Sequence, residues 1–154
     1  MDPKKIIEYA NIHSQDQDEE TAHLVIGLDK VITSRSVKGL NIETAQIEEG
    51  VEIKVKIVPG TIIARPVHMC FGLVQQEGIQ RIKLSVDAGE ESQIEILAHC
   101  VFPNAEDVQH LMDAEINIGR KAKYRYTERH IHSDAGGITV VPKAKVNIAE
   151  EGEF

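Results

Sequence analysis

The sequence is poor in aromatic residues, which make up 4% of its 154 residues, and it lacks Trp. Hydrophobic residues nevertheless reach 42%, so the core must be built from Ile, Val, Leu and Ala. Ile and Val are β-branched and suit a pleated sheet better than a helix. We therefore expect a mostly β protein, long enough to form one domain with a real core.

Positive charge is also scarce, since the formal net charge is −8. Nucleic-acid binding requires clustered Lys and Arg to meet the phosphates, and this charge balance argues against a nucleic-acid partner. Basic residues do gather in the run 119–125, but Asp and Glu flank it. We interpret this run as a mixed, solvated face.

Only two cysteines occur, Cys70 and Cys100, and they form no CxxC pair. No apolar run approaches the roughly 20 residues that span a bilayer, and residues 1–5 lack the apolar segment of a signal peptide. We expect a cytoplasmic protein with reduced thiols and no membrane partner.

Motifs of self-sufficient enzymes are absent: there is no GxSxG, no P-loop, no GxGxxG after a strand and no HExxH. We therefore predict a scaffold or binding platform rather than an enzyme.

The chain divides into an N-terminal helix and loop segment, residues 1–30, and a strand-rich core, residues 31–154. Asp2 and Pro3 are suited to start a short helix over residues 4–10. The acidic stretch 15–20 is expected to form a loop.

A repeated phrase runs through the core: apolar–x–x–Gly, a few polar residues, then an alternating strand. Its anchors are Gly50, Gly89, Gly119 and Ala149, so a first step of 39 is followed by two equal steps of 30. A fixed period in this range is typical of stacked repeats, and strand-rich units predict a parallel β-solenoid with coils of about 30 residues. The extra residues of the first step would form a turn at 58–61. The alternative is an antiparallel sandwich with coincidental turn spacing.

Between two of these strands, residues 104–111 contain a cap residue and helix formers, which would allow a short helical turn. Residues 110–118 alternate well enough to form a strand. We favour a brief turn followed by a strand.

In a solenoid, residues one period apart stack at the strand spacing of about 4.8 Å. A 30-residue step places Cys70, Cys100 and His130 on one ladder. Thiolate and imidazole suit soft or borderline metals, so this column could hold zinc or one edge of an iron–sulfur cluster. Neighbouring ladders add candidate metal ligands: His68, His99, Glu128 and, two residues after His130, His132.

The alternative for the cysteine column is ordinary packing. Cys100 shares its parity with Ile94 and Ile96, which are expected to face inward, and free Cys is often buried.

A different function remains open for His130 and His132. Their HxH spacing puts both side chains on one strand face, as in cupin-type metal sites. With His99 and Glu128 they could serve a small metal-dependent enzyme, whose barrel would be antiparallel.

Three long phrases carry a family likeness: residues 64–73, 97–105 and 136–146. They resemble the SufB/SufD family of iron–sulfur cluster assembly proteins, particularly its short forms in anaerobic bacteria and archaea, over about residues 23–154. The resemblance implies a right-handed parallel β-helix that acts as a scaffold for transient clusters built from persulfide sulfur and iron. It also implies a complex with a SufC-type ABC ATPase, which hydrolyses the ATP.

The chain departs from the family in two ways. Family members continue through more coils to a helical segment that docks the ATPase, whereas this chain stops at Phe154, so we expect an incomplete β-helix. The family's functional Cys, Glu and His lie toward the end of the β-helix, and none is carried over here. An open last coil exposes strand edges, and we expect a homodimer, or pairing with a related chain, through residues 146–154. A purely structural solenoid that binds a protein through its acidic face is a third possible function.

Overall fold

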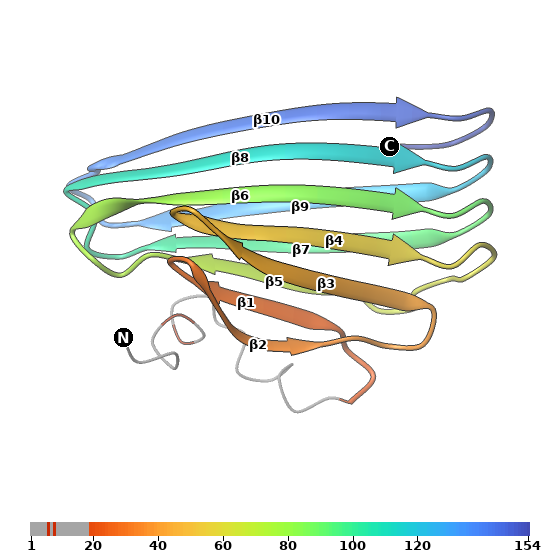
Figure 1. Ribbon diagram of the computed structural model, residues 1–154, viewed down its shortest axis with the longest axis horizontal. Helices are drawn as coiled ribbons and strands as arrows, with labels where there is room; N and C mark the ends of the chain where they lie inside the picture. Colours follow the sequence, from red (N-terminus) through yellow and green to blue (C-terminus); the bar gives the residue numbers. More distant parts are fainter. Residues whose placement is uncertain (1–5, 7, 9–18) are drawn as a thin grey trace.

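The computed structural model describes Ile6, Glu8 and residues 19–154, and within them it contains ten strands in two five-stranded sheets (Figure 1). In chain order the strands are β1 (His23–Gly27), β2 (Lys30–Arg35), β3 (Leu40–Ile47), β4 (Gly50–Ile57), β5 (Val67–Gly72), β6 (Glu77–Ala88), β7 (Gln93–Phe102), β8 (Asp107–Ile118), β9 (Lys123–His132) and β10 (Ile138–Ile148). The helical segment expected over residues 4–10 lies, apart from two residues, outside the described part of the chain, as does most of the loop expected over 15–20. Among the described residues, no helix is long and apolar enough to cross a membrane.

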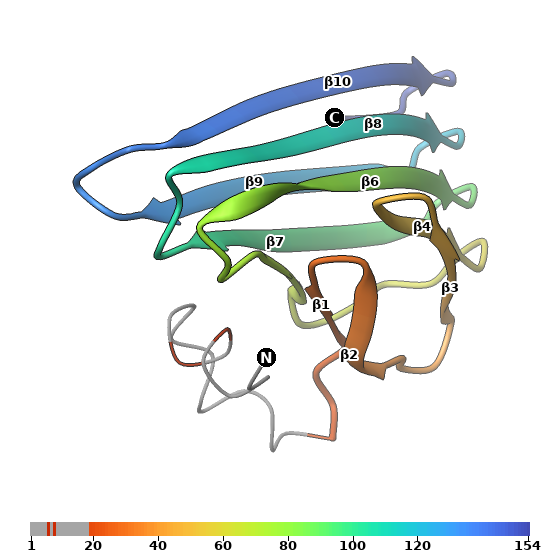
Figure 2. The same ribbon diagram turned by 60° about the vertical axis from the view of Figure 1, so that its left-hand side comes forward.

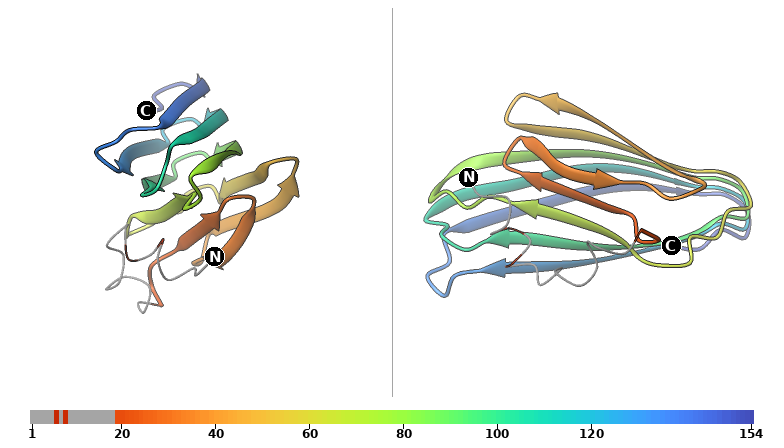
Figure 3. Two further views of the ribbon diagram at one scale, coloured as in Figure 1. Left: turned by 90° about the vertical axis from the view of Figure 1, so that its left-hand side faces the viewer. Right: turned by 90° about the horizontal axis from the view of Figure 1, so that it is seen from below.

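From β4 onward, consecutive strands alternate between the two sheets. One sheet has the order β2-β1-β5-β7-β9 and the other β10-β8-β6-β4-β3. The pairs β5–β7, β7–β9, β4–β6, β6–β8 and β8–β10 are all parallel, and the coils stack one upon another (Figure 3). This arrangement confirms the solenoid. It rules out both the antiparallel sandwich and the cupin-like barrel.

Antiparallel hairpins close the N-terminal end of the stack. β1 pairs with β2 and β3 pairs with β4, each in antiparallel register (Figure 2). β2 and β3 are therefore the first edge strands of the two sheets. Each hairpin thereby pairs the edge of β1 or β4 that faces away from the parallel coils.

The core lies between the two sheets and consists of stacked aliphatic side chains. Strand β4 shows the alternation clearly, with Val51, Ile53, Val55 and Ile57 buried and the residues between them facing outward. Burying each such side chain contributes roughly 1.5–3 kcal/mol. Period-2 alternation in the sequence thus specifies which face of each strand meets the core.

At two coil corners a glycine stands where the backbone of the preceding coil comes close. A Cβ built on Gly89 would lie 2.6 Å from the carbonyl oxygen of Ile57, and one on Gly119 would lie 2.8 Å from that of Ala88. The position equivalent to these two is Val58, not Gly50, because Gly50 follows the β3–β4 hairpin turn. The choice of Gly50 as the first anchor, and with it the 39-residue step, was wrong. A hairpin turn and a coil corner can both have the pattern apolar–x–x–Gly.

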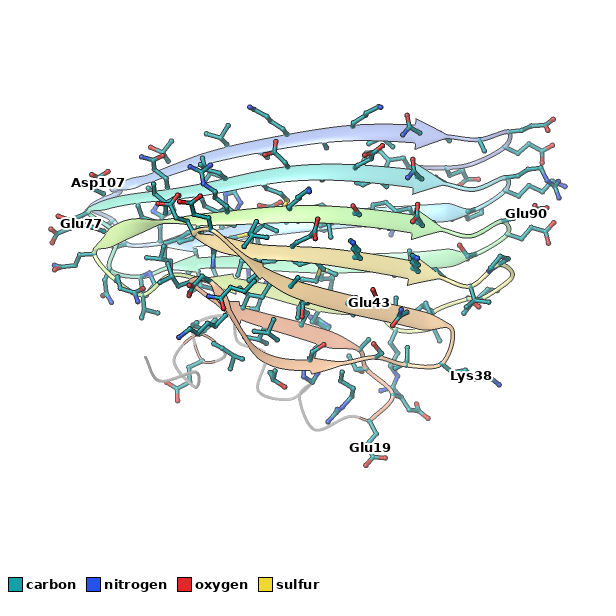
Figure 4. The ribbon with its side chains drawn as sticks, in the orientation of Figure 1. Glu19, Lys38, Glu43, Glu77, Glu90 and Asp107 are labelled. Atoms are coloured by element: carbon teal, nitrogen blue, oxygen red, sulfur yellow. The ribbon has the colours of Figure 1, made fainter. Side chains whose placement is uncertain are left out.

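The basic run at 119–125 alternates with acidic neighbours along the coils. Arg120 contacts Glu90 of the preceding coil, and Lys123 Nζ lies 3.3 Å from Glu153 Oε1 of the next. Figure 4 shows Glu90 pointing outward at the corner after β6. The run is therefore the mixed, solvated face that we expected.

The connection that follows β7 is a turn, and the strand after it is β8, which begins at Asp107. The brief turn followed by a strand is therefore confirmed.

Candidate functional site

The two cysteines lie on opposite faces of the same sheet. Strand β5 pairs with β7 so that Cys70 is opposite His99 and Phe71 is opposite Cys100. This step is one residue shorter than the step between β7 and β9, which puts Cys100 opposite His130. The predicted ladder was therefore right for Cys100 and His130 and wrong for Cys70, because a one-residue change of register moves a side chain to the other face.

Cys70 packs on the outer face of its sheet. It is fully buried in a small apolar cluster with Ile6, Val25 and Val101. Burial raises the pKa of its thiol to about 12, so the thiolate is suppressed. Cys70 is an apolar packing residue in this environment.

Cys100 instead faces the core and meets polar groups from both sheets. Its Sγ lies 3.7 Å from Nε2 of His110, which comes from β8 of the opposite sheet. The thiol also donates to Oε1 of Glu128 on β9, at 3.4 Å. Ligand atoms of these three residues all lie within 4.8 Å of one another. A thiol, an imidazole and a carboxylate thus converge inside the coil stack.

His110 is held from behind by Gln80 on β6. The Nδ1 atom of His110 lies 3.0 Å from Oε1 of Gln80, and both side chains are fully buried. The Gln80 Nε2 group donates to the carbonyl oxygens of Leu28 and Gly72, at 2.8 and 3.2 Å. The rings of Phe71 and Phe102 pack around the imidazole, with centroids 6.0 and 5.3 Å away.

Glu128 is fixed by two further side chains of its own strand. The Tyr126 hydroxyl donates to Oε2 of Glu128 at 3.0 Å, and Nε2 of His130 contacts Oε1. His130 is partly exposed, whereas the Glu128 side chain is only 18% exposed. Tyr126 also lines a surface hollow of about 710 Å³, together with residues that include Phe154.

Burial governs the protonation of the cluster. It lowers the pKa of His110 to about 4, so the imidazole is neutral. Burial, reinforced by the charge of Glu128, raises the pKa of the Cys100 thiol far above its ordinary value. Burial also acts to raise the pKa of Glu128, but hydrogen bonds from His130, Tyr126 and Cys100 outweigh it and leave that pKa lowered. The resting cluster is therefore a neutral thiol, a neutral imidazole and a carboxylate.

Three other candidate ligands, His68, His99 and His132, do not join this cluster. His68 and His99 lie on the outer face, where their rings stack with centroids 6.0 Å apart. His132 bonds the carbonyl oxygen of Ser133 through Nδ1, away from the cluster. Of the candidate metal ligands predicted from the neighbouring ladders, only Glu128 lies in the core site. His68 and His99 have the opposite parity and face outward, whereas His132 shares the face of Glu128 but lies at the end of β9, opposite Phe102.

Sequence reasoning missed three members of the site: Gln80, His110 and Tyr126. A signal for two of them was present, since Gln80 and His110 are one coil period apart and stack as a pair in adjacent strands. Both occupy inward positions that are otherwise apolar, and a polar residue at such a position is a candidate for function.

Two curated relatives are similar to the chain over most of its length. One is an iron–sulfur cluster assembly SufBD family protein of Methanocaldococcus jannaschii, 30% identical over 147 residues that cover 92% of the chain and 46% of the relative. The other is a SufBD family protein with the same description from Pyrococcus horikoshii, 28% identical over 133 residues that cover 86% of the chain and 40% of the relative. The chain thus spans less than half the length of these relatives. No family model and no solved structure matches the chain.

Proposed function

Because the chain belongs to the SufBD family of iron–sulfur cluster assembly proteins, we propose that it is a scaffold on which iron–sulfur clusters are assembled. The observation that carries this proposal is the convergence of Cys100, His110 and Glu128 in the core. Thiolate, imidazole and carboxylate are ligand types that iron accepts in proteins.

Within this scaffold, Cys100 is the residue that holds iron or sulfur during assembly, with His130 next to it on the adjacent coil. Their pairing across β7 and β9 supports this role. Cys70 has no part in it, because its thiol packs among apolar side chains on the other face of the sheet. The bound cluster is transient cargo rather than a resident cofactor.

The scaffold works with a SufC-type ABC ATPase, and ATP hydrolysis belongs to that partner, so the chain itself is not an enzyme. The family likeness of residues 64–73, 97–105 and 136–146 supports this assignment. The protein acts in the cytoplasm, where the two unpaired cysteines stay reduced.

A second scaffold chain, either another copy or a related SufBD protein, pairs at the β9–β10 end. In the described part of the chain these two strands lie at the outer edges of their sheets, and an edge strand offers backbone groups for pairing. Ile148 and Phe154, both more than half exposed, add apolar surface there.

Anaerobic reconstitution with ferrous iron and sulfide tests the scaffold role. The protein should gain the broad visible absorption of a bound cluster, and Cys100→Ala should lose it. The matched control is Cys70→Ala, which removes the other buried thiol and should retain the absorption. Equal retention by both variants would contradict the proposal.

A pull-down with a SufC-type ATPase tests the partner. The wild-type chain should retain the ATPase. Cluster formation without ATPase binding would support the scaffold site and reject that partner, whereas ATPase binding without cluster formation would reduce the chain to a structural interaction module.

A further inference from the structure

The hydrogen bonds of Gln80 determine which nitrogen of His110 carries the proton. The Gln80 Nε2 group donates its hydrogen bonds to the carbonyl oxygens of Leu28 and Gly72. The Oε1 atom therefore faces Nδ1 of His110, at 3.0 Å. An amide oxygen only accepts, so Nδ1 must donate and the neutral ring leaves a lone pair on Nε2.

The Nε2 lone pair of His110 faces the Cys100 thiol, which already donates its proton to Glu128. Cys100 has one S–H proton, yet two acceptors face its sulfur: Nε2 of His110 at 3.7 Å and Oε1 of Glu128 at 3.4 Å. The proton can satisfy only one of them. A sulfur, an imidazole nitrogen and a carboxylate oxygen thus converge within 4.8 Å of one another with a single thiol proton between them, which is the donor set of a metal site.

The spacing of these atoms fits a tetrahedral metal ion. With metal–sulfur bonds of about 2.3 Å and metal–nitrogen or metal–oxygen bonds of about 2.0–2.1 Å, two ligands of a tetrahedron lie roughly 3.4–3.6 Å apart. The sulfur–oxygen separation of 3.4 Å lies in this range, the sulfur–nitrogen separation of 3.7 Å lies just above it, and all three donor atoms lie within 4.8 Å of one another. The three donors could therefore close on one ion with small rotations of their side chains.

The surroundings of the three donors also suit a cation. Gln80 supports the imidazole and Tyr126 supports the carboxylate at 3.0 Å each, as outer hydrogen-bond partners of metal ligands commonly do. A thiolate and a carboxylate would balance the charge of a dication in a place where burial makes an unbalanced charge costly. His130 contacts Glu128 from the more exposed side of the cluster.

We propose that Cys100, His110 and Glu128 bind one divalent transition-metal ion, of the class of ferrous iron or zinc, inside the coil stack, and that Gln80 is a positioning residue that presents Nε2 to it. Binding breaks the Cys100 S–H bond and forms a metal–sulfur bond, with the proton released to solvent. The biological use of this site rests on the proposed function. The site deepens that function because it names a single metal ion as the ligand of the core.

Titration of the reduced protein with Co²⁺ under anaerobic conditions tests the site. One equivalent should produce the intense thiolate-to-cobalt charge-transfer absorption, and Zn²⁺ should displace it. Cys100→Ser should abolish that absorption, while the control Cys70→Ser should keep it. Absence of the band in the folded wild-type protein, or its survival in Cys100→Ser, would overturn the proposal.

Gln80 is tested by its conservative variant. Gln80→Glu keeps an oxygen that accepts from Nδ1, but it sets a second oxygen against the carbonyl oxygens of Leu28 and Gly72. It should therefore bind Co²⁺ more weakly than the wild type and more tightly than Gln80→Leu. Gln80→Leu removes the acceptor and should weaken Co²⁺ binding roughly 10–100-fold, with circular dichroism to establish that it folds. If it does not fold, Gln80→Asn, whose shorter side chain draws the oxygen away from Nδ1, replaces it. Unchanged affinity in the folded variant would remove Gln80 from the site.

The two proposals fail separately. Co²⁺ binding that depends on Cys100, together with no cluster on reconstitution, would support the metal site and reject the scaffold role. A cluster that depends on Cys100, together with no Co²⁺ absorption, would support the scaffold role and reject the mononuclear site.

Discussion

Cys70 and Cys100 lie on neighbouring strands yet face opposite sides of their sheet, because the register between β5 and β7 sets Cys70 opposite His99 rather than opposite Cys100. The two thiols consequently have different neighbours: aliphatic side chains for Cys70, and a polar cluster for Cys100. A substitution at Cys70 therefore changes apolar packing alone, whereas a substitution at Cys100 changes the polar cluster. Each cysteine serves as the control for the other.

The first prediction concerns stability. Cys70→Ser places a hydroxyl among apolar side chains and should cost about 1–3 kcal/mol of unfolding free energy. Cys100→Ser should cost less, because the new hydroxyl can donate to His110 or Glu128, whose atoms already face the sulfur. Urea denaturation of both variants measures the difference. The reverse order would contradict the assignment of the two faces.

The second prediction concerns pH. The folded-state pKa of His110 is about 4, below its ordinary 6.5, so below pH 6.5 the unfolded chain takes up a proton that the folded protein does not. The free energy of unfolding should therefore be highest above about pH 6.5. It should fall by on the order of 3 kcal/mol as the pH drops toward 4. Denaturant midpoints measured across this window give the slope.

A matched pair of variants tests whether His110 causes this dependence of stability on pH. His110→Gln should reduce the slope between pH 6.5 and 4, while His68 and His99, whose pKa values burial also lowers, still contribute to it. The control is His132→Gln, since His132 is exposed and bonds a backbone carbonyl, and it should leave the slope as in the wild type. An unchanged slope in His110→Gln would place the acid sensitivity elsewhere.

The third prediction concerns a coil corner. Gly119→Ala forces a methyl group against the backbone of the preceding coil, at 2.8 Å from two of its atoms, and should cost at least about 1–3 kcal/mol through strain. Glu90→Ala, at the same corner, removes an exposed ion pair with Arg120 and should cost less than about 1 kcal/mol. Thermal unfolding compares the two variants.

The fourth prediction concerns assembly. Light scattering should give a dimer, and Ile148→Lys should shift it toward the monomer, because a charge at a half-exposed apolar position on β10 opposes contact there. Val31→Lys is the control, since Val31 is exposed on β2 at the other end of the stack. A wild-type monomer at high concentration would count against pairing through this end.

The sequence by itself predicted the stacked β coils, because strand alternation and corner glycines are local properties. The pattern of Val51, Ile53 and Val55 needs only the two-residue period of a strand to specify a buried face. The 30-residue step likewise placed His130 opposite Cys100, since the connections in those coils have matching lengths. The anchor at Gly50 failed because a hairpin turn uses the same residues as a coil corner.

The tertiary structure decided the site. The face of Cys70 depends on a register that is one residue shorter than the period, and a shift of one residue inverts every side chain of a strand. The meeting of Cys100 with His110 depends on two sheets packing against each other, since these residues come from strands of different sheets. Periodicity describes neighbours along and between strands of one sheet, whereas contacts across the core arise only when the coil closes.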